Sequence, residues 1–125
     1  MRRIAVDLDG TLIEDDKWPD MGEWLPGARE ALKTLAAEYD EVVILTCRTA
    51  NRERDEITHR NPEDQISAIE DLLLDAEIPE NVYVWTLPFK PNADFYLDNK
   101  ALRFTGNWGG TLNQIKTLQA VERVG

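Results

Sequence analysis

The feature that most constrains the fold is an alternation of short apolar strand patterns with helical patterns. Residues 3–8 and 41–46 are runs of mostly aliphatic residues, and residues 26–39 between them repeat apolar side chains at helical spacing. Strands that are apolar on both faces are typical of parallel sheets covered by helices. The chain therefore begins with a strand–helix–strand unit.

The middle of the chain continues this pattern with a second helix. A strongly charged loop, residues 47–60, precedes it. Asn61 is the expected N-cap and Pro62 the first helical residue, because asparagine caps helices well and proline is tolerated in the first turn. The apolar stripe of this helix consists of Ile66, Ile69, Leu72 and Leu73.

Two further strands and a last helix complete the chain. Residues 81–85 and 93–98 have strand patterns, and Thr111 with Gln114 forms a capping box for the last helix. The order βαβαββα predicts an α/β sandwich around a mostly parallel sheet, in a single domain over residues 1–125. The link between the last two strands is short for a parallel crossover, so either that link is extended or one of the strands runs differently.

Composition limits the location and the partners. The formal net charge is -10, from 24 acidic and 14 basic residues, and such a surface repels nucleic-acid phosphates. The single cysteine, Cys47, excludes an intramolecular disulfide and suits a reducing compartment. No apolar run is long enough to span a bilayer. We expect a cytoplasmic protein without a membrane partner, and the oligomeric state stays open.

Polar residues stand where the predicted strands end. Asp7 and Asp9 end the first strand, Thr46 the second and Asp98 the fourth, and Lys90 follows the third. These residues should converge, because ligands bind at the carboxyl ends of parallel strands. Two close carboxylates repel unless a cation lies between them, and Mg²⁺ prefers such oxygen ligands. Lys90 and Thr46 would then suit a phosphoryl group.

These residues resemble the motifs of a known family. The sequence DLDGT, residues 7–11, resembles the first motif of the haloacid dehalogenase (HAD) superfamily. Thr46 resembles its second motif, Lys90–Pro91 the third, and Asp98 in FYLDN the fourth, all in the family's order. Most members are Mg²⁺-dependent phosphohydrolases. The resemblance implies a Rossmann-like three-layer sandwich and an aspartyl-phosphate mechanism.

The resemblance also assigns roles to the five residues at the strand ends. Asp7 would attack phosphorus as the nucleophile, and Asp9 would act as the general acid and base. Mg²⁺ would be bound by Asp7, Asp9 through its backbone carbonyl, and Asp98. Thr46 would donate to a phosphoryl oxygen, and Lys90 would offset the charge of the intermediate.

Further residues are expected beside the substrate. Gly10 allows a tight turn next to the phosphate, Thr11 follows it, and Arg48 lies two residues beyond Thr46. Asn99 stands where the family often has a second acid in the fourth motif, which would lower the affinity for the metal.

The chain leaves no room for a large cap domain. About fourteen residues separate Thr11 from Pro26, too few for a folded cap. We therefore expect an open site and an Mg²⁺-dependent phosphohydrolase that acts on small phosphomonoesters. Two alternatives stay open: a non-catalytic or regulatory protein that binds phosphate or metal on the same fold, and a phosphatase that acts on phosphorylated nucleic-acid ends.

The remaining polar and aromatic residues have ordinary interpretations. Trp18 and Trp24 either cover the core or wall the site, and Trp85 is expected in the core. Asp94 begins a strand, so it should lie far from the site. Solvated side chains are expected for Glu14, Asp15, Asp16, Arg52, Arg54 and Arg60.

Overall fold

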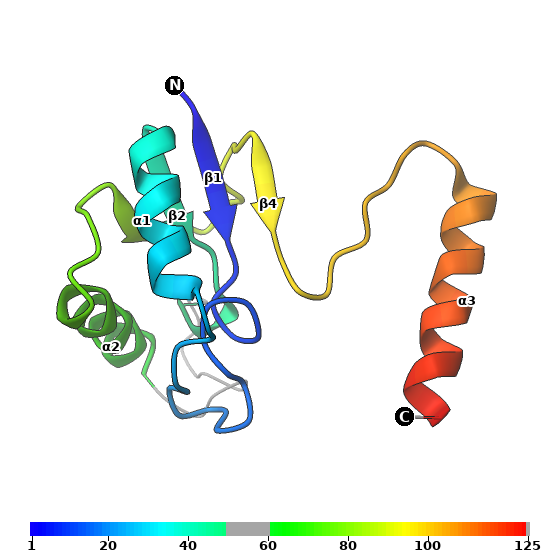
Figure 1. The fold of residues 1–125 in the computed structure, drawn as a ribbon, viewed down its shortest axis with the longest axis horizontal. Helices are drawn as coiled ribbons and strands as arrows, with labels where there is room; N and C mark the ends of the chain where they lie inside the picture. Colours follow the sequence, from blue (N-terminus) through cyan, green and yellow to red (C-terminus); the bar gives the residue numbers. More distant parts are fainter. Residues whose placement is uncertain (50–60, 125) are drawn as a thin grey trace.

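The computed structural model describes residues 1–49 and 61–124 and has an α/β fold around one sheet (Figure 1). Within these described ranges the sheet has four strands, all parallel, in the order β3-β2-β1-β4. Their bounds are Arg3–Val6 for β1, Glu41–Ile44 for β2, Val82–Val84 for β3 and Phe95–Leu97 for β4. This confirms the predicted parallel α/β architecture. The predicted solvated side chains of Arg52, Arg54 and Arg60 lie outside the described residues.

Helices α1 (Ala28–Glu38) and α2 (Pro62–Asp75) cover the same face of the sheet (Figure 1). Alternate strand side chains point to this face, and they pack against apolar residues one helical turn apart. α1 contributes Ala28 and Leu32, and α2 contributes Ile69 and Leu73. The strand residues in this core are Ile4, Val6, Val42, Ile44, Val82 and Val84.

The second face of the sheet is covered by the link between β3 and β4. Residues 85–94 carry the chain from one edge of the sheet to the other without a helix. Trp85 is buried against Ala5 and Val43 on this face, as predicted for a core residue. The short link is therefore extended and the strands stay parallel, which resolves the alternative left open by the sequence.

The N-termini of the helices lie only in part where the sequence predicts them. Asn61 Oδ1 accepts the Glu63 N–H at 2.8 Å, so Asn61 is the N-cap of α2, as predicted. The last helix, α3 (Trp108–Val124), begins earlier than the capping box at Thr111 suggested. Asn107 is its N-cap and accepts the Gly110 N–H at 3.0 Å. Its side chain thereby satisfies an amide that has no partner within the helix.

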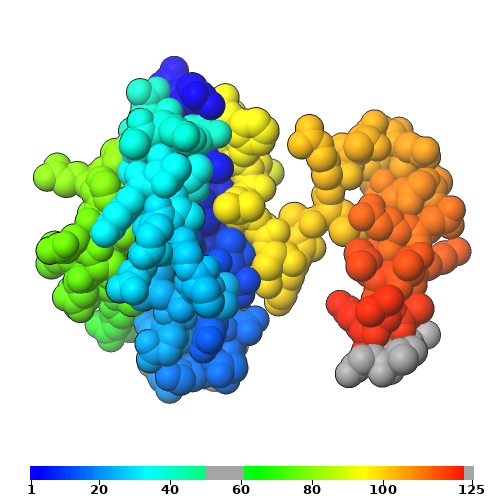
Figure 2. All heavy atoms as spheres, viewed as in Figure 1, coloured from blue at the N-terminus to red at the C-terminus, as the bar shows by residue number. Residues whose placement is uncertain are grey.

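α3 stands apart from the rest of the molecule. Residues 98–107 lead away from the end of β4, and the helix lies beyond them as a separate mass (Figure 2). The structure thus has a body, residues 1–49 and 61–99, and a C-terminal arm, residues 100–124. Within the described residues, no helix has both the length and the apolar character needed to cross a membrane.

Candidate active site

The candidate site lies where the strand order of the sheet reverses. The chain passes from β1 to β2 and β3 in one direction, and then returns to place β4 on the other side of β1. Asp7 N–H donates to the Leu97 carbonyl at 2.9 Å, so β1 and β4 stay paired up to their carboxyl ends. Open parallel sheets bind ligands at such a switch point. A pocket of about 690 Å³ opens there.

The lining of this pocket is strongly acidic. Among the described residues, the charged side chains that line it are four carboxylates and one ammonium: Asp7, Asp9, Asp15, Asp98 and Lys100. Asp15 is exposed, as the sequence predicts, and it also lines the pocket, which the sequence did not indicate. An anionic ligand can enter such a pocket only if cationic charge is supplied there.

Asp7 is the carboxylate most affected by this environment. Partial burial raises its pKa, and the nearby Asp98 raises it further, with a smaller contribution from Asp9. Hydrogen bonds from Thr11 and the Leu8 backbone act in the opposite direction. A carboxylate held near another in a partly desolvated site favours either a proton or a cation.

Thr11 and Gly10 join the turn after β1 to the end of β4. The Thr11 hydroxyl donates to Asp7 Oδ2 at 3.2 Å and accepts the Asn99 N–H at 3.2 Å. Gly10 has a φ of 83°, and a Cβ there would lie 2.4 Å from Asn99 Nδ2. The sequence correctly predicted that Gly10 permits a tight turn. Neither residue lines the pocket: Thr11 links the two strand ends by hydrogen bonds, and Gly10 permits their close approach.

Asp9 is bound by Arg48. The guanidinium donates from Nε to Oδ2 and from Nη2 to Oδ1, both at 2.8 Å. The Arg48 side chain is fully buried, whereas that of Asp9 is 14% exposed. Such a two-point contact between guanidinium and carboxylate is strong and well oriented. In this arrangement both oxygens of Asp9 are engaged.

Arg48 is part of the protein interior rather than a substrate contact. Its Nη1 donates to Gln65 Oε1 at 2.8 Å, and its guanidinium lies over the Trp18 ring at 4.4 Å. The expectation that Arg48 touches the substrate is corrected, because its donors are taken up by protein acceptors. Trp18 also lines the pocket, so it both walls the site and covers Arg48.

Gln65 is buried on the inner face of α2 and was not predicted from the sequence. A signal was present, because Gln65 precedes Ile69 by one helical turn and so occupies a core-facing position. A buried amide needs a hydrogen-bond partner, and Arg48 provides it.

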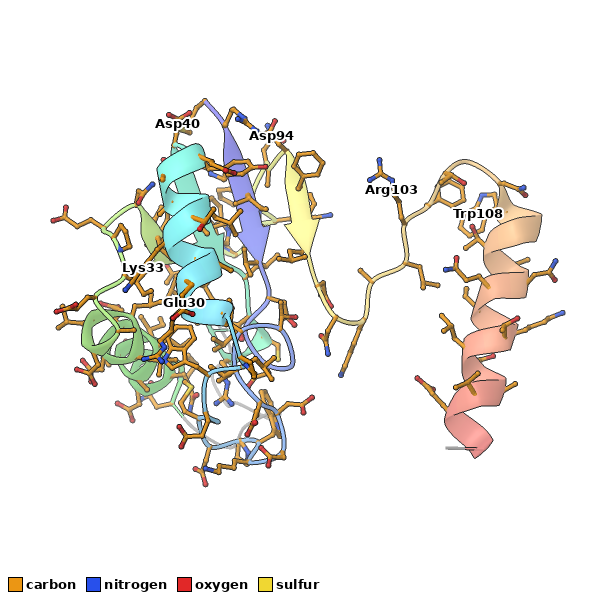
Figure 3. The ribbon with its side chains drawn as sticks, in the orientation of Figure 1. Glu30, Lys33, Asp40, Asp94, Arg103 and Trp108 are labelled. Carbon is orange, nitrogen blue, oxygen red and sulfur yellow. The ribbon has the colours of Figure 1, made fainter. Side chains whose placement is uncertain are left out.

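The two remaining polar residues predicted for the site have different outcomes. Thr46 lines the pocket, and its hydroxyl oxygen accepts the Arg48 N–H at 3.2 Å. Lys90 is not brought to the pocket, since its ammonium lies over the Tyr96 ring at 4.2 Å. Lys100, directly after the fourth motif, is the lysine that lines the pocket. Asp94 lies at the opposite end of β4, as expected, and accepts the Arg3 N–H (Figure 3).

The donor set fits a magnesium ion bound by two carboxylates. In the described part of the chain, no three acidic, histidine or cysteine side chains are arranged to hold an ion by themselves. The expected ligands are the carboxylates of Asp7 and Asp98 and the backbone carbonyl of Asp9, and the ion pair with Arg48 engages only the Asp9 carboxylate. Mg²⁺ is commonly held by one or two carboxylates with water and phosphate oxygens, so the carboxylates of Asp7 and Asp98 are enough for such a site.

Comparisons with known proteins bear on the fold. No model of a protein family and no curated protein matches this sequence. A solved structure from Bacteroides thetaiotaomicron, described as a conserved protein, resembles the chain with a TM-score of 0.52 and 24% sequence identity. The match covers 92% of this chain and 89% of that one. The chain is therefore similar in fold to a conserved bacterial protein of almost the same extent.

Proposed function

We propose that this protein is an Mg²⁺-dependent phosphohydrolase of the HAD type that acts on small phosphomonoesters. Asp7 is the nucleophile, Asp98 shares the metal with it, and Thr46 donates to a phosphoryl oxygen. Bound Mg²⁺ would neutralise charge on the phosphoryl group during in-line transfer. Lys100 takes the role of the ammonium at the pocket, in place of Lys90.

The observation that carries this proposal is the pairing of Asp7 with Asp98 in an acidic pocket at the switch point. Partial burial raises the pKa of Asp7, and the nearby Asp98 raises it further, which is unfavourable for a nucleophile unless a cation offsets it. A divalent ion between the two would restore the ionised form and attract a phosphate into the pocket. The DLDGT sequence and the position of Thr46 support the same chemistry.

The reaction would proceed in two steps on Asp7. A carboxylate oxygen attacks phosphorus while the bond to the leaving oxygen breaks, and that oxygen takes a proton. Water then attacks phosphorus, the aspartyl bond breaks, and inorganic phosphate leaves. Asp9 supplies and later accepts the proton, and for this it must release at least one oxygen from Arg48.

The pocket favours a small substrate over a large one. Its volume of about 690 Å³ lies in the range typical of small-molecule sites. The net charge of -10 disfavours a polyanion such as a nucleic-acid end.

The test is hydrolysis of p-nitrophenyl phosphate with and without Mg²⁺. We expect Mg²⁺-dependent release of p-nitrophenol that falls at least about 10³-fold in Asp7→Asn, the loss expected for a nucleophile. Asp94→Asn makes the same chemical change at the far end of β4 and should leave the rate near that of the wild type. Hydrolysis that survives Asp7→Asn would overturn the mechanism.

The second candidate is a protein that binds Mg²⁺ and phosphate without turnover. It is favoured by the contact of Arg48 with both oxygens of Asp9, which leaves no free acid for the leaving group. Calorimetric binding of Mg²⁺ and inorganic phosphate to the wild type, together with no hydrolysis of a panel of phosphomonoesters, would favour this candidate.

A further inference from the structure

The C-terminal arm has an apolar face that the described residues of the body do not cover. Trp108 and Leu112 are 67% and 53% exposed, and Ile115 and Leu118 extend the same side of α3. The helix does not pack on the body in the structure (Figures 1 and 2). An amphipathic helix of this length gains most of its stability from packing that face against another surface.

The body has an exposed apolar surface at β4, on which the apolar face of α3 could pack. Phe95 pairs in register with Ile4, and Leu97 with Val6, so both point to the face that α1 and α2 cover elsewhere. They are nevertheless 53% and 49% exposed. β4 is also an edge strand, with one side unpaired among the described strands. Exposed apolar edges of this kind are usually covered in stable proteins.

The charges of the two parts are complementary. Residues 1–99 contain 23 acidic and ten basic residues, whereas residues 100–125 contain four basic residues and one acidic residue. The arm is thus a cationic segment beside a strongly anionic body. Electrostatics therefore favours contact between an arm and a body.

The length of the link before α3 indicates that the body on which α3 packs is that of another chain. Ten residues, 98–107, separate β4 from α3, whereas a strand and the helix that packs on it are usually joined by about two to six residues. The link also carries exposed Leu102 and Phe104, and Phe104 packs on Trp108 with ring centroids 4.7 Å apart. Docking of α3 on its own β4 would leave this apolar link as an unsupported loop, whereas an arm that reaches a neighbour can cover it.

We propose that two copies of this chain exchange their C-terminal arms. The α3 helix of each copy packs its apolar face on Phe95 and Leu97 of the other copy. Because the exchange is reciprocal, the two copies form a closed dimer with two-fold symmetry. The apolar face of α3 and the exposed apolar surface of β4 are then buried in both copies. This inference does not depend on the proposed catalytic activity.

The first test is the mass of the full chain in solution, measured by light scattering and sedimentation. We expect a dimer, and a monomer at micromolar concentration would overturn the proposal. Leu112→Asp combined with Ile115→Asp should weaken the dimer at least about 100-fold, as expected when two buried anchors are lost. The control is Asn113→Asp with Thr117→Asp, which adds the same charge on another side of α3 and should leave the dimer intact.

A substitution in the body provides an independent test, in case α3 unfolds in the Leu112–Ile115 variant. Phe95→Asp changes the opposite side of the proposed interface and should also give monomers. Circular dichroism and the melting temperature would show whether the body stays folded. Dimers that persist in both the Phe95 and the Leu112–Ile115 variants would overturn the proposal.

Cross-linking separates exchange from docking within one chain. In a Cys47→Ser background, one tagged chain carries Phe95→Cys and a second, co-expressed chain carries Leu112→Cys. A flexible bismaleimide should join the two chains. A chain that carries both cysteines and is cross-linked only internally, without any product of two chains, would show that α3 docks on its own body and would overturn the exchange.

Discussion

Arg48 donates to both carboxylate oxygens of Asp9, and its side chain is fully buried while it does so. The pair joins the turn after β2 to the turn after β1, and its Asp9 member lines the acidic pocket. A buried guanidinium with several protein acceptors gives this part of the site a fixed geometry. The same contact keeps Asp9 from acting as an acid until one oxygen is released.

The Arg48–Asp9 pair should therefore contribute strongly to folding. In a double-mutant cycle with Arg48→Met and Asp9→Asn, we expect a coupling energy of about 2–3 kcal/mol, at the upper end of such values. Arg48→Met alone should lower the free energy of unfolding by about 3–5 kcal/mol, because it leaves a partly buried carboxylate unpaired. Urea unfolding followed by tryptophan fluorescence measures both quantities.

The matched control for this cycle is the pair formed by Lys17 and Glu23. Their charged atoms are 3.6 Å apart, and the side chains are 51% and 78% exposed. Solvent screens such a pair, so its coupling energy should be about 0–0.5 kcal/mol. Equal coupling energies for the two pairs would contradict the structural role of Arg48.

Asp7→Asn should stabilise the protein at neutral pH while it removes activity. The raised pKa means that the native state binds the Asp7 proton more tightly than the unfolded chain does. The free energy of unfolding therefore falls as pH rises through that pKa, and the penalty is complete above it. The substitution removes the penalty, so we expect a melting temperature about 2–5 °C higher at pH 7.

The pH dependence of this gain distinguishes it from an ordinary packing effect. It should shrink as pH falls toward the usual aspartate pKa of about 4, where Asp7 is protonated in the wild type as well. Asp16→Asn changes an exposed carboxylate nearby and should have no such effect. A gain in melting temperature that is the same at pH 4 and pH 7 would contradict the interpretation.

Magnesium should stabilise the wild type through Asp7 and Asp98. At ten times its dissociation constant, a ligand that binds only the native state adds about 1.4 kcal/mol to the free energy of unfolding. Asp98→Asn should lose most of this gain. Asp94→Asn, on the same strand but at its other end, should keep it (Figure 3). An equal Mg²⁺-induced shift of the melting temperature in both variants would place the ion elsewhere.

The sequence predicts the fold and the strand-end carboxylates because both follow from local patterns. Apolar runs and helical spacing identify the elements, and parallel strands bring Asp7 and Asp98 to one edge. The partner of Arg48 could not be predicted, because it lies 39 residues away and is met only in the folded core. The choice between Lys90 and Lys100 depends on the path of residues 85–94, which no local pattern specifies. Helical spacing likewise predicts α3 but not the surface on which it packs.

Gly10 provides the last prediction, because the chain contains a natural control for it. Gly10 and Gly27 both have left-handed backbones, with φ of 83° and 81°. A Cβ on Gly10 would meet Asn99 Nδ2 at 2.4 Å, whereas one on Gly27 would meet nothing within 4 Å. Gly27→Ala should therefore cost only the backbone strain, about 1–2 kcal/mol.

Gly10→Ala should cost more than Gly27→Ala by about 1 kcal/mol, the lower end of the usual cost of overpacking, because the obstructing Asn99 side chain is exposed and can turn away. Hydrolysis and Mg²⁺ binding should fall only slightly, because the Thr11 hydroxyl that contacts Asp7 accepts the backbone N–H of Asn99 and not its side chain. Chemical unfolding and the p-nitrophenyl phosphate assay measure the two effects. Pairing Gly10→Ala with Asn99→Gly removes the obstructing side chain, so the extra loss of stability should disappear while the backbone strain remains. If that pair were as unstable as Gly10→Ala alone, contact with Asn99 would not be the cause.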